Sequence, residues 1–163
     1  MEQFTGKIWL LGDDIDTDII IPTEYLVFKT IAEMAPYAFS PLRPELAAKI
    51  SEGDIIVAGS NFGCGSSREQ APEVIKALGV KAVIAKSFAR IFFRNAINNG
   101  LMLIENGTLA DEAAEGDSLT VVVNDRIDYK GKSYPVASMP GNLLEIIRAG
   151  GLVKAMRRRN GLD

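Results

Sequence analysis

Short apolar runs alternate with amphipathic segments through the middle of the chain, and this alternation predicts a parallel α/β unit. Residues 54–58, 81–86 and 101–104 are rich in Ile, Val, Leu and Ala, which is typical of strands that are buried on both faces. Residues 70–78 and 87–98 repeat apolar side chains at helical spacing. An order of strand, helix, strand, helix, strand predicts one parallel sheet with the helices packed against it.

The regions on either side of this unit predict further elements. Residues 23–37 combine loop with a short helix, and residues 19–21 form a β-branched run that Pro22 ends. Residues 124–125, Asn-Asp, separate two strand-like runs and are a hairpin signal. The other expected elements are strands at 7–11, 118–123, 126–129 and 133–136, and helices at 44–50, 141–149 and 152–159. The later strands add an antiparallel meander, and we expect a single domain over residues 1–163.

The segment between the first buried strand and the next helix has the most unusual composition. Residues 59–69 hold three glycines, which permit positive φ and close approach to a ligand, and then Ser66, Ser67 and Arg68. A helix start offers free N–H groups and a partial positive charge, so these side chains suit a carboxylate or a phosphate. The alternative is a tight turn in which Ser66 or Ser67 is an ordinary N-cap. The run matches neither the Walker loop nor the Gly-x-Ser-x-Gly nucleophile elbow.

Four other features are candidates for a role in a site. Residues 12–18 contain four aspartates. They indicate a solvated turn, a calcium-binding loop, or a turn in which one aspartate orients a catalytic group. The glycine and the flanking helix that an EF-hand requires are missing. Cys64 lies between two glycines and would need a lowered pKa to act as a nucleophile. Residues 25–28 form an apolar patch, which is either part of the core or the wall of a ligand pocket. Ser87 is expected to be the N-cap of the helix that follows it.

The composition restricts the chemistry that the chain can perform. It is 47% hydrophobic and 24% charged with a net charge of −3, which indicates a globular protein and argues against a nucleic-acid surface. The apolar runs are too short to span a membrane, no secretory signal is visible, and the single cysteine is compatible with the cytoplasm, which is the expected location.

The absence of histidine is the strongest chemical restriction. It excludes a Ser-His-Asp hydrolase within this chain and, with one cysteine, argues against a self-contained zinc or iron–sulfur site. Any catalysis therefore depends on Ser, Lys, Tyr, Arg or carboxylate groups, or on groups that a partner supplies.

Three stretches together resemble one family closely. They are GDDIDTDIIIP at residues 12–22, GSNFGCGSSREQAP at 59–72 and AKSFARIFFRNA at 85–96. In order and spacing they are similar to the small subunits of 3-isopropylmalate dehydratase, which correspond to the swivelling fourth domain of aconitases. The resemblance runs from about residue 5 to the C-terminus. It implies a three-layer β/β/α swivelling domain that works only with a separate large subunit, in a heterodimer or heterotetramer.

The resemblance also implies that two chains share the active site. The large subunit would hold a four-iron, four-sulfur cluster, a Lewis acid that binds the substrate hydroxyl and a carboxylate, and this chain would bind no metal. Ser66 matches a serine that acts as the base. Its alkoxide would remove a proton from the substrate, a small dicarboxylate, at the carbon next to a carboxylate. Water then leaves the substrate and adds again at the neighbouring carbon. Ser67 and Arg68 match residues that bind the substrate carboxylates. Asp18 matches an aspartate that supports a histidine of the partner, and Gln70 stands where many aconitase-type sequences have a titrating histidine.

Val27 is the candidate residue for substrate specificity. At the matching position, relatives that act on tricarboxylates have an arginine that binds the additional carboxylate. A valine packs against an isopropyl or methyl group, whose burial favours binding by roughly 1–3 kcal/mol, whereas burial of an unpaired carboxylate is costly. The implied reaction is the isomerisation of 2-isopropylmalate to 3-isopropylmalate in leucine biosynthesis. Alternatives are a related dehydratase acting on 2,3-dimethylmalate, on citramalate or citraconate, or on homoaconitate, a non-catalytic anion-binding module, and a purely structural partner subunit.

Overall fold

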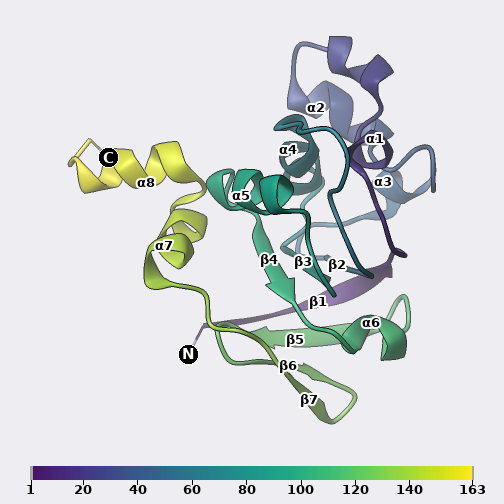
Figure 1. Ribbon diagram of the computed structural model, residues 1–163, viewed down its shortest axis with the longest axis vertical. Coiled ribbons are helices and arrows are strands. Elements are labelled where there is room, and N and C mark those ends of the chain that lie inside the picture. The colour runs from purple at the N-terminus through teal and green to yellow at the C-terminus, as the bar shows by residue number, and fades with distance from the viewer. Residues whose placement is uncertain (1, 163) are drawn as a thin grey trace.

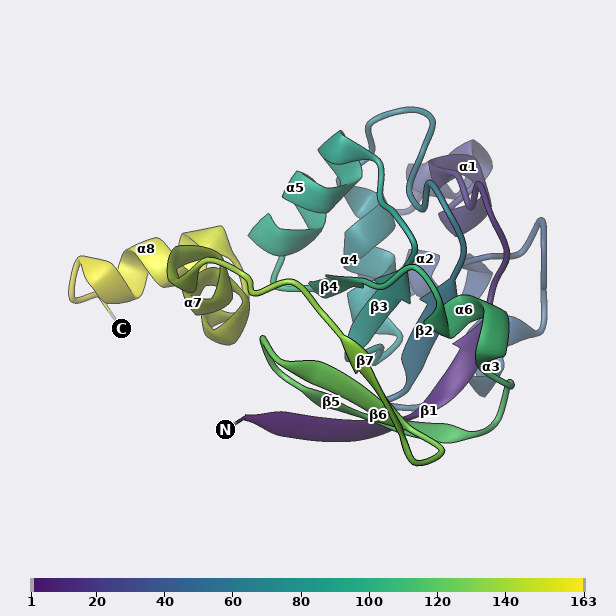
Figure 2. The same cartoon turned by 60° about the horizontal axis from the view of Figure 1, so that its bottom comes forward.

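A curled sheet of seven strands is the centre of the computed structural model, which describes residues 2–162 (Figures 1 and 2). The strands are β1 (Gln3–Leu10), β2 (Ile55–Ala58), β3 (Ala82–Ala85), β4 (Met102–Glu105), β5 (Ser118–Val122), β6 (Arg126–Tyr129) and β7 (Lys132–Pro135). Their order across the sheet is β4-β3-β2-β1-β5-β6-β7. The four strands from β4 to β1 are parallel, and β5 to β7 continue the sheet beyond β1 as an antiparallel meander.

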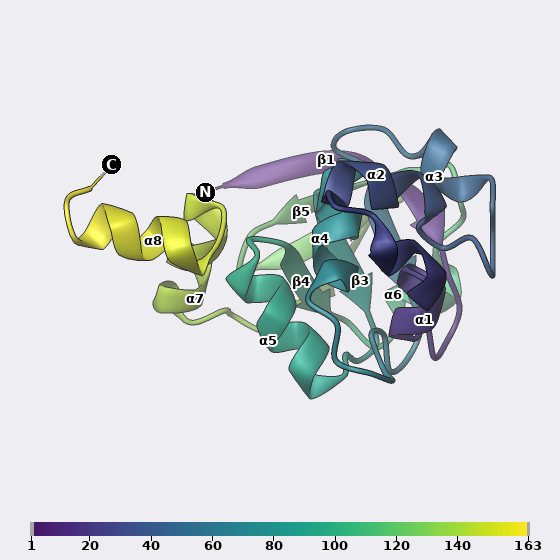
Figure 3. The same ribbon diagram turned by 90° about the horizontal axis from the view of Figure 1, so that it is seen from above.

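The helices lie mainly along the parallel part of the sheet. They are α1 (Thr17–Ile20), η1 (Thr23–Val27), α2 (Ile31–Met34), η2 (Ala35–Tyr37), α3 (Leu46–Lys49), α4 (Gln70–Ala77), α5 (Arg90–Asn98), α6 (Leu109–Glu112), α7 (Gly141–Ala149) and α8 (Leu152–Arg159). Helices α4 and α5 connect successive parallel strands and pack above them, whereas α7 and α8 extend to one side (Figures 1 and 3). Within residues 2–162, no helix is long and apolar enough to cross a bilayer.

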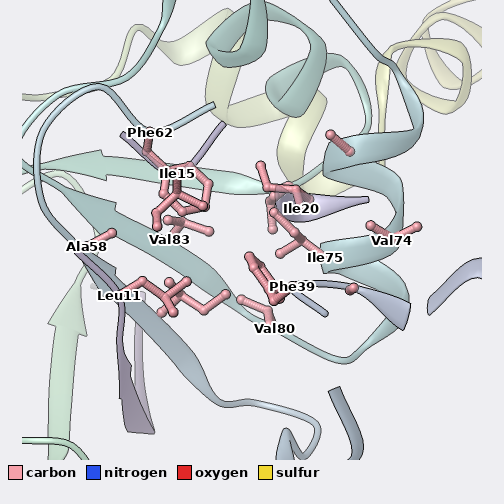
Figure 4. Packing of buried hydrophobic residues seen from close by; sticks show 14 of the residues in the cluster. Leu11, Ile15, Ile20, Phe39, Ala58, Phe62, Val74, Ile75, Val80 and Val83 are labelled. Carbon is pink, nitrogen blue, oxygen red and sulfur yellow. The ribbon is translucent and has the colours of Figure 1, made fainter. Parts of the chain in front are cut away.

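Each parallel strand lies between two hydrophobic cores, which gives the fold its three layers. In β2, Ile56 and Ala58 contribute to the core beneath the helices, and Ile55 and Val57 to the core shared with the antiparallel strands. Figure 4 shows the first of these cores, with side chains from α4 and from the strands. The order of helices, parallel strands and antiparallel strands confirms the predicted β/β/α fold. Burial on both faces is the reason that these strands are continuous apolar runs in the sequence.

All but two of the predicted elements are confirmed, with ends that differ from the prediction by at most three residues. Strand β1 begins at Gln3, well before the predicted start, because its first half pairs with β5. The β-branched run at residues 19–21 forms no strand. Its first part belongs to the helical turn α1, because the Asp16 side chain caps the turn by accepting a hydrogen bond from the Ile19 N–H (2.9 Å).

An ion pair between Arg43 and Glu115 ties the segment before α3 to the segment before β5 (2.6 Å). The hydrogen bond from Arg43, aided by one from the Leu10 N–H, lowers the pKa of Glu115. Such a carboxylate stabilises the fold above its unfolded pKa of about 4.3, and the contribution is lost as the pH falls through the depressed folded pKa. We therefore expect Glu115→Gln to lower the free energy of unfolding at pH 7 by less than about 1 kcal/mol, because the pair is partly exposed.

Urea unfolding of both proteins at pH 7 and in acid measures this contribution. The difference should disappear in acid, below the depressed pKa. As the control, Glu24→Gln should change nothing at either pH, because Glu24 forms no ion pair with a residue that the structure describes. A difference for Glu115→Gln that is independent of pH would contradict the ion-pair explanation.

Candidate active site

Three loops after the carboxyl ends of β1, β2 and β3 meet at one edge of the sheet, where parallel α/β proteins usually bind ligands. We call the first two the Asp-rich turn (residues 12–18) and the Gly-rich loop (residues 59–69). Backbone hydrogen bonds join them; in one, the Thr17 N–H donates to the Cys64 carbonyl (2.9 Å). These bonds continue the pairing of β1 and β2 beyond the strands, so each loop supports the other.

The third loop, after β3, holds the Gly-rich loop from the opposite side. The Ser87 hydroxyl accepts a hydrogen bond from the Asn61 N–H (2.8 Å), and the Ser87 carbonyl accepts one from the Phe62 N–H (3.0 Å). The prediction that Ser87 is a helix N-cap is therefore wrong. Helix α5 begins at Arg90 with Ala89 at the N-cap, because the Ser87 hydroxyl is engaged with the neighbouring loop.

Two glycines let the Gly-rich loop pass close to α5 and the Asp-rich turn. Gly63 has a φ of +85° and Gly65 a φ of +91°, a left-handed region that side chains strain. A Cβ atom on Gly63 would overlap the ring of Phe92. The loop therefore needs glycine at position 63 for both its backbone conformation and its contact with α5.

Ser66 and Ser67 line a cavity of about 220 Å³ between the Gly-rich loop and the first turn of α5. Their hydroxyls make no hydrogen bond with any described residue, and the backbone N–H groups from Gly65 to Glu69 donate to none. Helix α4 begins at Gln70 with Glu69 at the N-cap, so the alternative that either serine is the N-cap is wrong. Unpaired hydroxyls and N–H groups around one cavity form the donor set expected of an anion site.

Thr17 fixes the position of Ser66. Its side chain is only 2% exposed, and its hydroxyl donates to the Ser66 carbonyl (2.7 Å). Replacing Thr17 with valine keeps the shape but removes the donor, so we expect the free energy of unfolding to fall by about 1 kcal/mol. Amide hydrogen exchange should become faster in the Gly-rich loop.

The control for this substitution is Thr5→Val. The Thr5 hydroxyl pairs with that of Thr120 on an exposed face, far from the loop in sequence (2.7 Å). Its loss should leave hydrogen exchange in the Gly-rich loop unchanged. If Thr17→Val also leaves that exchange unchanged, then Thr17 does not position Ser66.

Arg68 is held against the loop that follows β1, and its side chain is 13% exposed. It donates to the Ile21 carbonyl (2.9 Å) and the Thr23 hydroxyl (2.8 Å), and it forms an ion pair with Asp18 (2.5 Å). A guanidinium has five N–H donors, so these three contacts leave the Nε–H and one N–H of Nη1 for a ligand. The ion pair joins the Arg68 and Asp18 side chains. Their expected roles, carboxylate binding by Arg68 and support of a partner's histidine by Asp18, stay predictions.

The aspartates of the Asp-rich turn have structural partners. Asp13 accepts a hydrogen bond from the Ser60 N–H (2.8 Å). In the part of the chain that the structure describes, no three His, Cys, Asp or Glu side chains are arranged to hold a metal ion, so the calcium alternative has no ligand set. Burial raises the pKa of the Cys64 thiol, and Asp16 and Asp14 raise it further, which disfavours a thiolate nucleophile.

Val27 is not among the residues that line the cavity. It ends η1, and it is 80% exposed. The neighbouring Tyr25 and Phe28 stack with Tyr37, with ring centroids 4.2 and 5.7 Å apart, and pack against the first core. Most of the apolar patch therefore belongs to the core, whereas Val27 points outward.

Among the cavity-lining residues to which the sequence analysis assigned no site role are Thr17 and Arg90. Thr17 stands within the Asp-rich turn, and a hydroxyl among aspartates is a weak signal for a positioning role. Arg90 belongs to the third motif of the family resemblance, but only the folded chain places it at the same cavity as Ser66.

The three-layer β/β/α architecture, with strand-end loops that meet at one cavity, is that of a swivelling domain. Residues 44–108 match the family model described as the aconitase C-terminal domain. The chain is 73% identical to the 3-isopropylmalate dehydratase small subunit of Lachnospira eligens over 99% of both chains. It is 51% identical to small subunit 1 of Archaeoglobus fulgidus, over 94% of this chain and 99% of the relative. The chain therefore belongs to the family of 3-isopropylmalate dehydratase small subunits.

A solved structure agrees with this assignment. The crystal structure of 3-isopropylmalate dehydratase from Methanocaldococcus jannaschii matches with a TM-score of 0.92 and 44% sequence identity, over 99% of this chain and 97% of that one. Fold and sequence thus identify the same family.

Proposed function

We propose that this chain is the small subunit of a hydro-lyase that isomerises 2-isopropylmalate to 3-isopropylmalate by dehydration and rehydration, a step of leucine biosynthesis. The observation that carries this proposal is the 73% identity to a 3-isopropylmalate dehydratase small subunit over 99% of both chains. The unpaired Ser66 hydroxyl at the cavity supports a catalytic role for the Gly-rich loop.

Ser66 is proposed as the base that removes a proton next to a substrate carboxylate. A hydroxyl is a very weak base, so its alkoxide requires a preorganised set of donors. The unpaired backbone N–H groups of residues 65–69 are available for that purpose, and Thr17 holds the Ser66 backbone in place. Because the loop is built before substrate binds, stabilisation of the charge needs little reorganisation.

Ser67 and Arg68 are proposed to bind a substrate carboxylate. The Ser67 hydroxyl and the two remaining N–H groups of Arg68 are the donors for it. Asp18 keeps the guanidinium oriented, and we propose that it also contacts a histidine of the large subunit, because its side chain is 63% exposed.

The large subunit is proposed to supply the rest of the site. The four-iron, four-sulfur cluster is proposed to be held by the partner, since this chain has a single cysteine and no histidine to bind one. When bound there, the cluster supplies a Lewis acid for the substrate hydroxyl. The exposure of Val27, and of Ile91 at the cavity wall, supports a partner that covers this face.

Competition between substrates tests the proposed specificity. The chain is combined with a cluster-loaded large subunit of the family, and kcat/KM is measured for 2-isopropylmalate, 2,3-dimethylmalate, citramalate and a tricarboxylate homologue. The proposal predicts the highest kcat/KM for 2-isopropylmalate. A higher value for any of the other three would assign the chain to a related dehydratase.

Val27→Arg tests the specificity residue itself. An arginine would bring a charge where the alkyl group of the substrate is expected, and would offer a partner to an additional carboxylate. We expect kcat/KM for 2-isopropylmalate to fall by about tenfold or more and the preference to shift toward the tricarboxylate, in line with the 1–3 kcal/mol of alkyl burial. Val153→Arg, on the exposed side of α8, is the control and should leave the preference unchanged. An unchanged preference in Val27→Arg would remove Val27 from the explanation of specificity.

A further inference from the structure

We propose that Arg90 binds a carboxylate of the substrate from the side of the cavity opposite the Gly-rich loop; this inference rests on the proposed function. Ser66, Ser67 and Arg68 line one wall of the cavity, and the first turn of α5, beginning at Arg90, lines another. A volume of about 220 Å³ is below the range of pockets for drug-sized ligands and suits a small dicarboxylate. The juxtaposition brings a second cation to the site where Ser66 would act.

Arg90 has more free donors than Arg68. Three protein contacts already occupy the Arg68 guanidinium. Arg90 is exposed, and it makes no hydrogen bond or ion pair with any residue from 2 to 162. A substrate with two carboxylates needs partners for both when water is excluded, because an unpaired buried charge is costly. The fully available guanidinium at the cavity is that of Arg90.

The start of α5 reinforces the positive charge of this wall. Ala89 occupies the N-cap and cannot cap the helix with its side chain, so the first-turn N–H groups have no side-chain acceptor. The helix has nine residues, and its dipole favours an anion at this end. An acceptor from outside the helix would satisfy these groups, and a substrate carboxylate bound to Arg90 provides one.

Aromatic packing fixes the position of the wall. Phe92 is buried, its ring packs edge-on against Phe62 with centroids 5.4 Å apart, and it lies over the backbone of Gly63. Because Phe92 follows Arg90 within the same helical turn, this contact sets the separation of Arg90 from the Gly-rich loop. Arg90 therefore stands on a rigid element, as a binding residue requires.

The test compares Arg90→Ala with Arg94→Ala in the complex with the large subunit. Arg94 is the matched control, since it lies one turn further along α5, is exposed, and does not line the cavity. Steady-state kinetics with 2-isopropylmalate are measured at saturating large subunit, and the affinity of the two subunits is measured separately. We expect Arg90→Ala to raise KM about 10- to 100-fold, the loss typical of a charged hydrogen bond, with subunit affinity unchanged. Arg94→Ala should retain the wild-type KM. Arg90→Lys should have a KM between those of the wild type and Arg90→Ala, because a lysine ammonium cannot bind a carboxylate in a bidentate manner.

Three results would overturn the proposal in distinguishable ways. A wild-type pair that does not turn over 2-isopropylmalate would reject the proposed function and this inference with it. An active wild-type pair, with an unchanged KM in Arg90→Ala, would reject the role of Arg90 alone. A reduced affinity of both variants for the large subunit, in the separate binding measurement, would assign α5 to the subunit interface instead of the substrate.

Discussion

Replacing Ser66 with alanine is expected to lower kcat of the reconstituted enzyme by about 10²–10⁴-fold, the range for loss of a general base. The fold should not change, because the Ser66 hydroxyl has no partner among the described residues and its carbonyl keeps the hydrogen bond from Thr17. The affinity for the large subunit should also stay the same. The rate is measured with 2-isopropylmalate at saturating large subunit.

Two other serines of the Gly-rich loop, Ser60 and Ser67, provide comparisons. Ser60→Ala should keep the wild-type rate, since Ser60 does not line the cavity. Ser67→Ala should act mainly through KM, because Ser67 is proposed to bind a substrate carboxylate. A Ser66→Ala complex with full activity would show that the base is a different group.

Replacing Gly63 with alanine is expected to have the largest effect on stability. The added methyl group meets the Phe92 ring, and overpacking of this kind costs about 1–3 kcal/mol. The φ of +85° adds about 1–2 kcal/mol for a residue with a Cβ atom. We therefore expect the free energy of unfolding to fall by about 2–5 kcal/mol, measured by urea denaturation.

Gly107→Ala is the matched control for Gly63. A Cβ atom at Gly107 would meet nothing within 4 Å, and Gly107 has no positive φ. Its stability should remain within about 0.5 kcal/mol of the wild type. A loss below about 1 kcal/mol for Gly63→Ala would mean that the loop and α5 move apart easily, and the fixed geometry inferred for Arg90 would be weakened.

The central α/β unit is the part of the fold that the sequence predicts best. Strands β2, β3 and β4 are buried on both faces, so each is an uninterrupted apolar run between turn residues. The helices between them have one apolar face and one polar face. This local pattern is independent of the rest of the chain, and that is why the predicted ends agree closely with the structure.

Two elements were less predictable, one for a local and one for a tertiary reason. The turn α1 consists of β-branched and polar residues that favour a strand, and its helical form depends on the cap by Asp16. The first half of β1 exists because β5, more than a hundred residues later, pairs with it. The pairing of β1 with β5 has no signal within a short window of sequence, whereas the Asp16 cap is a local contact that competes with the strand preference of the residues after it.

In the site, too, some features follow from local composition and others depend on tertiary structure. The donor-rich character of the Gly-rich loop follows from its composition, and so does the exclusion of a histidine-based mechanism. The ion pair of Arg68 with Asp18 and the position of Arg90 at the cavity depend on three separate loops meeting at the sheet edge. The exposure of Val27 outside the cavity was likewise not evident from its apolar neighbours.

The central claim is that this chain supplies one half of an active site. Its most direct test is the rate of 2-isopropylmalate isomerisation by this chain alone, by the cluster-loaded large subunit alone, and by the two together. If the two subunits share one active site, neither subunit alone should turn over 2-isopropylmalate, and the pair should. Turnover by this chain alone, or a stable pair with an intact cluster and no turnover, would contradict it.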